Sequence, residues 1–117
     1  MANYAETLDE MFLALGDPTR RAIVRRLATG AATVKELAAP FTMALPSFMK
    51  HLGVLERSGL IRSRKQGRIR TCELQPAALR GVETWLAEQQ AIWEARTDRL
   101  AAYVEALHRK ETTHGRR

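Results

Sequence analysis

Ten consecutive residues, RSRKQGRIRT at positions 62–71, contain five basic side chains and no acid. The longer stretch from Ala44 to Cys72 has seven lysines and arginines against the single acid Glu56, a net charge of +6. The whole chain of 117 residues also has a net charge of +6, so the remainder of it is neutral. Charge gathered in this way favours contact with an anion over simple solubility. We therefore expect a polyanionic partner.

The basic stretch has the pattern of a β-hairpin over residues 61–74. Two runs that suit β-strands flank KQGR at 65–68, where Gly67 supplies the positive φ of a tight turn. An exposed hairpin could carry cations only to discourage edge-to-edge pairing. The helix predicted just before it makes phosphate binding the favoured interpretation. The side chains expected to bind phosphate are Arg62, Arg64, Lys65, Arg68 and Arg70.

The helix expected before the hairpin covers residues 45–58. Phe48, Leu52 and Leu55 fall on one face at spacings of four and three, which predicts core positions. Ser47, Lys50 and His51 share another face that points outward, where Lys50 could meet a phosphate or a base edge. For His51, partial burial with a hydrogen bond to the scaffold is an equal alternative. Arg57 could likewise reach phosphate or pair locally.

Other helices frame these two elements. A first amphipathic helix precedes Gly16, and a second, within 17–30, starts at Asp17 and Pro18. A short helix at 33–40 begins with a capping box of Thr33 and Glu36. A long helix follows over 76–108, and the tail at 109–117 is expected to fray. Its heptad-like seam runs through Leu79, Val82, Leu86, Gln89, Trp93, Arg96, Leu100, Tyr103 and Leu107.

Composition excludes several classes of protein. The chain has 45% hydrophobic residues, one cysteine and no apolar run long enough for a bilayer, which predicts one domain over 1–117 in the cytoplasm. No arrangement of a nucleophile and base, paired carboxylates or a phosphate-binding glycine loop suggests an enzyme. Cys72 stands alone and is expected to be buried, so no metal or other cofactor is predicted.

The order of the elements is that of a winged helix-turn-helix, a mainly α fold with a small β-hairpin wing. A major groove about 12 Å wide admits one helix, whose outward side chains meet base edges. Cations beside it fix the register on the phosphates. The helix at 45–58 would be the recognition helix, braced by the one at 33–40. The hairpin would bind the DNA backbone or minor groove.

The motifs LGDPTRRAIVRRL, KHLGVLERSGLI and QGRIRTCELQP resemble the ArsR-type (ArsR/SmtB) repressors of bacteria, over about residues 8–107. The end of the chain is similar to a branch of that family that does not sense metals. In relatives, positions 44 and 49 often hold serines, as helix cap and DNA contact; here they are Ala44 and Met49. The cap would then pass to Thr42 or be missing, and base readout at Met49 would be more apolar.

The resemblance implies a homodimer joined through the first and last helices. Trp85 and Trp93 could instead line an effector site, although packing at the dimer seam is the favoured interpretation. The interface residues expected are Leu8, Met11, Phe12, Leu86, Trp93, Leu100, Tyr103 and Leu107.

The predicted function is thus a dimeric, sequence-specific regulator of transcription, a repressor in the favoured interpretation. Its partner would be double-stranded DNA with an imperfect palindrome, whose half-sites lie about 10 bp apart. No membrane partner is expected, and whether the protein has an effector is left open. The alternative is a helical dimer whose basic patch binds an acidic protein or RNA.

Overall fold

The computed structural model describes the backbone of residues 4–115 and the side chains of residues 6–112. Contacts within the chain divide it into two compact units, residues 1–82 and 83–117. The first unit contains all the elements before the long C-terminal helix and the first turns of that helix. The second unit is the rest of the same helix. The expectation of one domain from 1 to 117 stays a prediction.

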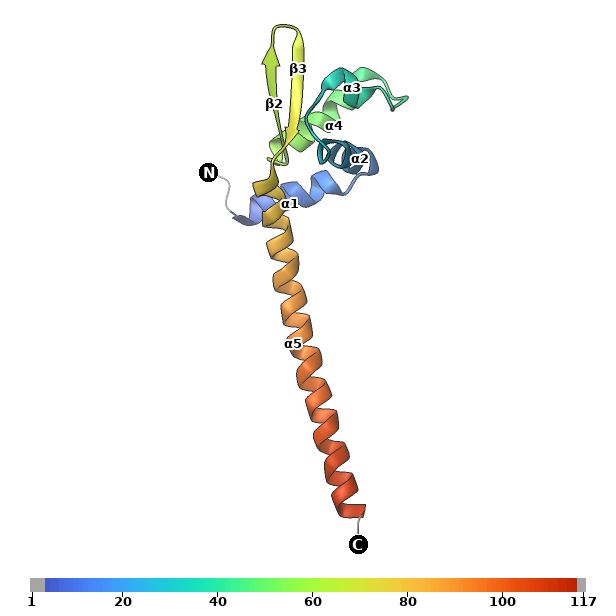
Figure 1. Ribbon diagram of the computed structural model, residues 1–117, viewed down its shortest axis with the longest axis vertical. Helices are drawn as coiled ribbons and strands as arrows, with labels where there is room; N and C mark the ends of the chain where they lie inside the picture. Colours follow the sequence, from blue (N-terminus) through green and yellow to red (C-terminus); the bar gives the residue numbers. More distant parts are fainter. Residues whose placement is uncertain (1–3, 116–117) are drawn as a thin grey trace. The chain divides into compact units, whose positions relative to one another are not determined.

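The elements of the first unit follow the predicted order. They are α1 (Tyr4–Leu15), α2 (Pro18–Leu27), β1 (Ala32–Thr33), α3 (Val34–Ala38), α4 (Leu45–Arg57), β2 (Ile61–Gln66), β3 (Ile69–Leu74) and the start of α5 (Pro76–Gly115). Helices α1, α2 and α4 lie together, and the β2–β3 hairpin extends away from them (Figure 1). This arrangement confirms the mainly α fold with a hairpin wing.

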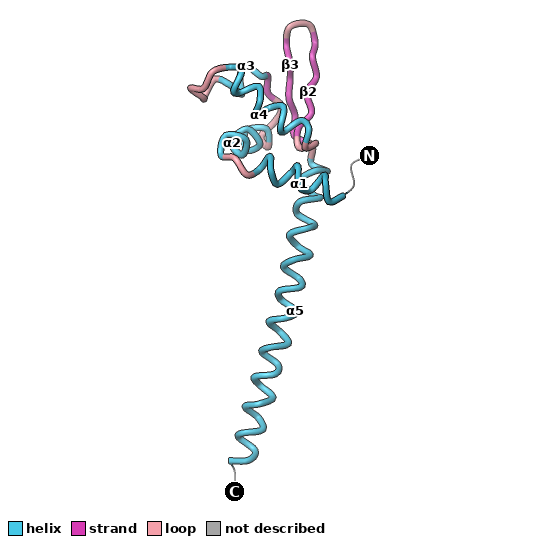
Figure 2. Tube along the Cα trace, turned by 180° about the vertical axis from the view of Figure 1, so that it is seen from behind, coloured by secondary structure: helices cyan, strands magenta, loops and turns pink. Residues whose placement is uncertain are grey.

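The hairpin belongs to a three-stranded antiparallel sheet with the order β1-β3-β2. Ile61 pairs with Leu74 at its base and Gln66 with Ile69 at its tip, so Gly67 and Arg68 make the turn. Gly67 has a φ of 65°, as the turn was predicted to need. Figure 2 shows β2 and β3 side by side in magenta, joined by a short loop. Strand β1, which is only two residues long, was not predicted.

The core of the first unit forms around the inner face of α4. Phe48, Leu52 and Leu55 are fully buried there, as predicted, and Cys72 of β3 is buried with them. Leu8 and Met11 of α1 are also buried, each only 7% exposed. Their apolar side chains are thus already covered within one subunit. The prediction that both belong to a dimer interface gains no support from this packing.

The helix starts explain how the turns between elements are fixed. Asp17 accepts hydrogen bonds from the N–H groups of Thr19 and Arg20, at 2.8 and 3.1 Å, and so caps α2. Thr33 accepts from the N–H of Glu36 at 3.1 Å and caps α3. Both caps were predicted. At α4 the capping position is Ala44, and no side chain caps the helix, which is the second of the two predicted alternatives.

Helix α5 is continuous over 40 residues and ends at Gly115. Residues 109–115 thus belong to this helix and residues 116–117 lie outside the described part, and the expectation of a frayed tail stays a prediction. No glycine or proline interrupts the chain between 109 and 114, and the Thr112 hydroxyl donates to the carbonyl of His108 at 2.9 Å. Within residues 4–115, no helix is long and apolar enough to cross a membrane.

Candidate nucleic-acid interface

The outward face of α4 has little charge. Ser47 and Lys50 are exposed there, as the helical spacing predicted. Pro46, Lys50, Gly53 and Arg57 line one shallow hollow along the helix, spaced by three and four residues. Arg57 is exposed, and within residues 6–112 it has no ion pair. Of the two alternatives for Arg57, local pairing is the one that this geometry does not support.

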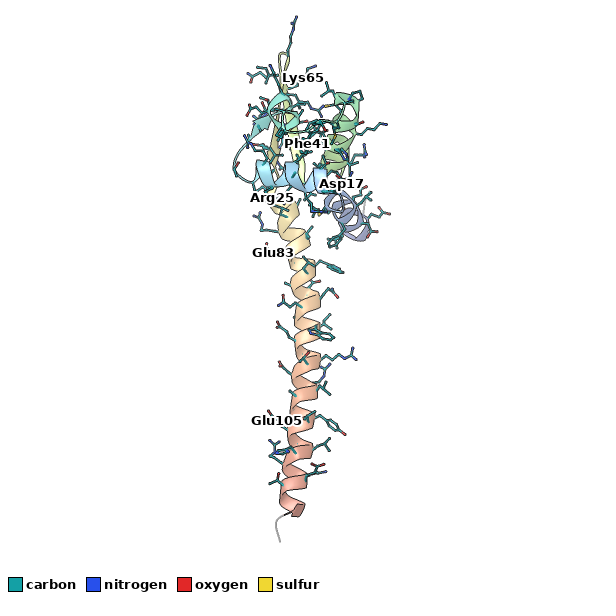
Figure 3. All side chains as sticks on the ribbon, turned by 90° about the vertical axis from the view of Figure 1, so that its right-hand side faces the viewer. Asp17, Arg25, Phe41, Lys65, Glu83 and Glu105 are labelled. Carbon is teal, nitrogen blue, oxygen red and sulfur yellow. The ribbon has the colours of Figure 1, made fainter. Side chains whose placement is uncertain are left out.

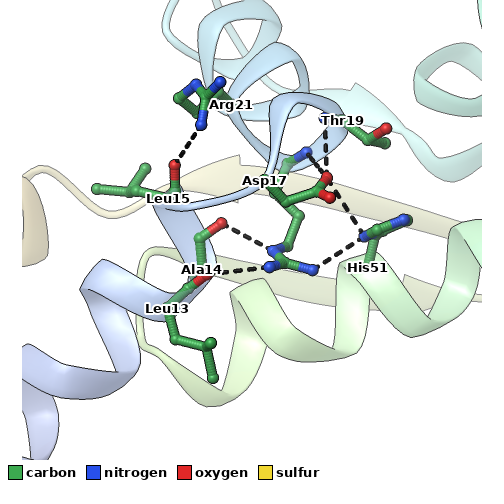
Figure 4. Close-up of polar contacts among 8 residues, drawn as sticks. Leu13, Ala14, Leu15, Asp17, Thr19, Arg21 and His51 are labelled. Carbon is green, nitrogen blue, oxygen red and sulfur yellow. Dashed lines mark hydrogen bonds and ion pairs between the residues drawn. The ribbon is translucent and has the colours of Figure 1, made fainter.

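His51 turns away from that face and toward α2. Its Nδ1 lies 3.1 Å from Nη1 of Arg20 and 3.7 Å from Oδ2 of Asp17 (Figure 4). Arg20 in turn donates from Nε and Nη2 to the backbone carbonyls of Ala14 and Leu13, at 2.8 and 3.0 Å. The His51 side chain is 23% exposed. Its observed role is thus to link α4 to the α1–α2 junction, and a DNA contact by His51 stays a prediction.

The surroundings of the Asp17 carboxylate in this cluster favour its charged form. Partial burial raises the pKa of Asp17, but hydrogen bonding and charge together outweigh this effect. The lowering contributions come from the N–H of Arg20, the charges of His51 and Arg20, and the N–H of Thr19. The pKa of Asp17 therefore lies below its ordinary value. Asp17 thus caps α2 and lies beside Arg20, whose guanidinium contacts His51 of α4.

The cations of the hairpin fall into two groups. Arg62, Lys65 and Arg68 are exposed and have no hydrogen bond or ion pair within the described side chains. Figure 3 shows Lys65 near the end of the hairpin. Arg64 is 82% exposed and lies 3.9 Å from a carboxylate oxygen of Glu73. These four side chains are available to bind phosphate from outside.

Arg70 differs from the other four cations because it is bound within the protein. Its Nη2 donates to Oε1 of Glu56 on α4, and its Nε donates to the hydroxyl of Ser63 at 3.0 Å. Ser63 itself donates to the same Glu56 oxygen at 2.7 Å. Only 35% of the Arg70 side chain is exposed. The assignment of Arg70 as a phosphate contact gains no support, since its donors already join the hairpin to α4.

A second hollow of about 1250 Å³ opens between α3, the start of α4 and the hairpin. Its wall is mostly apolar and its rim is basic. The residues that line it are Thr33, Val34, Lys35, Ala38, Ala39, Phe41, Leu45, Met49, Ser63, Lys65, Arg68, Ile69 and Arg70. Met49, a predicted contact, lies in this hollow and is partly buried.

Three further residues at this surface were missed from the sequence. Leu45 and Ile69 are each 59% exposed, and Gly53 leaves the middle of the α4 face without a side chain. The spacing of Leu45 and Met49, one helical turn apart, would have placed both on one face. Nothing in the sequence marks Ile69 as exposed. An isoleucine between two arginines in a strand would ordinarily be predicted to face the core, with the arginines facing solvent.

The surroundings of Cys72 disfavour the thiolate form of its side chain. Burial raises the pKa of its thiol, the nearby charge of Glu56 raises it further, and Arg70 lowers it only in part. The predicted reading of Cys72 as a small buried residue is confirmed, since it is fully buried in the core.

In the second unit, the seam predicted for dimerisation is exposed. The side chains of Leu86, Trp93, Leu100, Tyr103 and Leu107 are between 44% and 65% exposed. On α1, Phe12 is 36% exposed. A helix that presents so many apolar side chains to water usually has a helical partner.

Sequence comparisons identify relatives of the chain. A family model described as a helix-turn-helix domain matches residues 15–64. The HTH-type transcriptional regulator Rv2034 of Mycobacterium tuberculosis is 41% identical over 76 residues, which cover 65% of this chain and 71% of the relative. The transcriptional repressor SdpR of Bacillus subtilis is 29% identical over 79 residues, which cover 68% of this chain and 88% of that protein.

Solved structures of transcriptional regulators are also similar to this chain. The crystal structure of an ArsR family transcriptional regulator is 61% identical, with a TM-score of 0.75, and the match covers 80% of this chain and 97% of that one. A homodimeric winged helix-turn-helix DNA-binding domain from Mycobacterium bovis is 23% identical, with a TM-score of 0.57 and coverage of 77% and 81%. At that identity the likeness concerns the fold alone.

Proposed function

Because the chain belongs to the ArsR family of helix-turn-helix transcriptional regulators, we propose that it is a homodimeric repressor that binds a palindromic operator. Helix α4 would enter the major groove, and the β2–β3 hairpin would bind the flanking backbone or the minor groove. The observation that carries this proposal is that the exposed, unpaired cations Lys65 and Arg68 line one hollow together with Leu45 and Met49 of α4.

The two elements suit different parts of a duplex. Phosphates are met by exposed cations that have no acid partner, as on the hairpin. Base edges are met by a helix face that carries short or polar side chains, such as Ser47, Lys50 and Gly53 on α4. The bond network of Arg70, Ser63 and Glu56 would hold the two at a fixed spacing.

Dimerisation would use the exposed seam of α5. Leu86, Trp93, Leu100 and Leu107 recur every seven residues, which is the repeat of a helix that pairs with another helix. A dimer places two recognition helices on one duplex, about one turn apart. Repression is proposed by analogy with SdpR, which is named as a transcriptional repressor. Such a repressor acts by covering a promoter.

The test is a titration of the full chain against duplexes at two salt concentrations. One duplex comes from the region upstream of the protein's own gene, and the other is its scrambled counterpart. We expect tighter binding of the native duplex and a steep loss with salt, with a log–log slope of about −0.9 for each phosphate neutralised. Equal binding of both duplexes, or tighter binding of an RNA or acidic protein competitor, would refute the proposal.

A matched pair of variants tests the dimer in the same assay. Leu100→Glu puts a charge into the predicted seam and should yield monomers in sedimentation equilibrium, with loss of operator binding. Glu105→Gln changes charge on the same exposed helix and should leave a dimer that binds normally. Unchanged assembly of the Leu100→Glu variant would contradict dimerisation through α5.

A further inference from the structure

The start of α4 presents an apolar side chain where a DNA-binding surface is otherwise basic or polar. Leu45 is the first residue of α4, and its side chain is 59% exposed. It takes no part in the core, whereas Met49, one turn later on the same side, packs partly against the core. The two side chains form an apolar edge of the hollow between α4 and the hairpin.

The surroundings of this edge indicate what would cover it. Lys65 and Arg68 lie on the same hollow from the hairpin side, and Lys35 lies on it from α3. An occupant must therefore be anionic at its rim and apolar at the point that meets Leu45. A DNA duplex has both features, because phosphates flank a major groove in which thymine alone exposes an apolar group, its C5 methyl.

Resting on the proposed function, we propose that Leu45, supported by Met49, recognises thymine C5 methyl groups in each half of the operator. The first residues of a recognition helix are those that contact base edges. Ala44 before Leu45 has no polar side chain, so no side-chain hydrogen bond at that position competes with an apolar contact. The preference for thymine at the operator positions that face Leu45 would therefore depend on apolar contact with its methyl group.

The experiment begins with a duplex enriched from a random pool by the full-length protein. Each thymine of one half-site is then replaced by deoxyuridine, which keeps the base pair and the O4 acceptor but lacks the methyl group. We expect one or two positions at which the replacement weakens binding about three- to fivefold, the value for one buried methyl group. At the remaining thymines, binding should be unchanged.

The variant Leu45→Ala should bind the thymine and deoxyuridine duplexes equally at those positions. The matched control is Ile69→Ala, since Ile69 is also 59% exposed and lines the same hollow, but from the hairpin. It should keep the difference between the two duplexes. If Leu45→Ala does not fold, judged by its thermal unfolding, Leu45→Gln gives the same test with a polar side chain of similar length.

The possible failures can be told apart. If no duplex is enriched from the pool, the proposed function itself is refuted, and the thymine contact with it. If a duplex is enriched but deoxyuridine binds as well as thymine at every position, only the methyl contact is refuted. If Leu45→Ala retains the full difference between the duplexes, the contact belongs to another residue and the assignment to Leu45 is wrong.

Discussion

Helix α4 and the β2–β3 hairpin lie side by side in the first unit, yet their exposed surfaces differ in how many cations they carry. The outward face of α4 combines Ser47 and Gly53 with only two cations, Lys50 and Arg57, and the exposed Leu45 lies beside it at the start of the helix. The hairpin, with two strands of six residues each, presents four exposed cations, from Arg62 near its base to Lys65 and Arg68 near its turn. Charge binds any phosphate, whereas short, polar and apolar groups distinguish bases.

This difference assigns separate contributions to DNA binding. The hairpin should supply most of the salt-dependent affinity, which is the same for every sequence. The face of α4 should supply discrimination between sequences and little of the salt dependence. Arg70 is the exception on the hairpin, because its hydrogen bonds to Glu56 and Ser63 make it a structural tie between the two elements.

The largest expected effect is that of removing two free cations from the hairpin. The double variant Lys65→Ala/Arg68→Ala should weaken binding to every duplex and make the log–log salt slope less steep by about 1.8. Discrimination between native and scrambled duplexes should stay the same, since neither residue lies on α4. Fluorescence anisotropy titrations at four or more salt concentrations give both quantities.

The control for this variant removes the same charge elsewhere. Arg25 of α2 and Arg80 of α5 are both exposed, and Figure 3 shows Arg25 well away from Lys65. Arg25→Ala/Arg80→Ala should leave the salt slope nearly unchanged. Equal slopes for the two double variants would mean that net charge, and not the hairpin, determines affinity.

A smaller effect, on stability, is expected at Arg70. Arg70→Ala removes two side-chain hydrogen bonds and leaves the partly buried carboxylate of Glu56 with Ser63 alone. We expect a loss of about 1–2 kcal/mol in the free energy of unfolding. The salt slope should change far less than in Lys65→Ala/Arg68→Ala, because Arg70 does not face outward. Urea unfolding followed by circular dichroism measures the loss.

Arg64→Ala is the matched control for that stability change. Arg64 lies 3.9 Å from Glu73, but its side chain is 82% exposed, and such ion pairs contribute about 0–1 kcal/mol. Its removal should therefore leave the urea midpoint almost unchanged. If Arg70→Ala made the log–log salt slope less steep by about 0.9, the value for one phosphate contact, the structural role of Arg70 would be contradicted. Arg70 would then be a DNA contact.

The contrast between Arg68 and Arg70 also shows where prediction from sequence ends. Helix starts, the hairpin turn at Gly67 and the core face of α4 follow from local spacing and turn chemistry, and all were predicted. Arg68 and Arg70 look equivalent in the sequence. They differ because folding brings Glu56 of α4 under the hairpin, a contact between residues 14 positions apart.

His51 reflects the same limit. Whether His51 faces outward depends on Arg20, 31 positions earlier, and not on the helical spacing around it. Strand β1 was missed since two residues carry no pattern.

The smallest expected effect comes from Gly53, and it has opposite signs for stability and binding. Glycine within a helix costs roughly 0.5–1 kcal/mol relative to alanine. A methyl group added at Gly53 would meet only Nη1 of Arg57, at 3.5 Å, which is an ordinary contact. Gly53→Ala should therefore raise the free energy of unfolding by that amount. It should also weaken DNA binding several-fold, because the methyl group would stand where base edges approach α4.

Gly81→Ala provides the comparison for Gly53→Ala, since Gly81 is also a helical glycine and no atom lies within 4 Å of an added methyl group. It should gain similar stability and bind DNA as before, because it lies on α5 and not on α4. Comparing the two variants by unfolding and anisotropy measurements separates the effect of helix propensity on stability from the effect of a DNA contact on binding. A Gly53→Ala variant that is more stable and binds DNA normally would show that α4 does not approach the duplex at this turn. Discrimination between sequences would then depend on Leu45 and Ser47, in the first turn of α4.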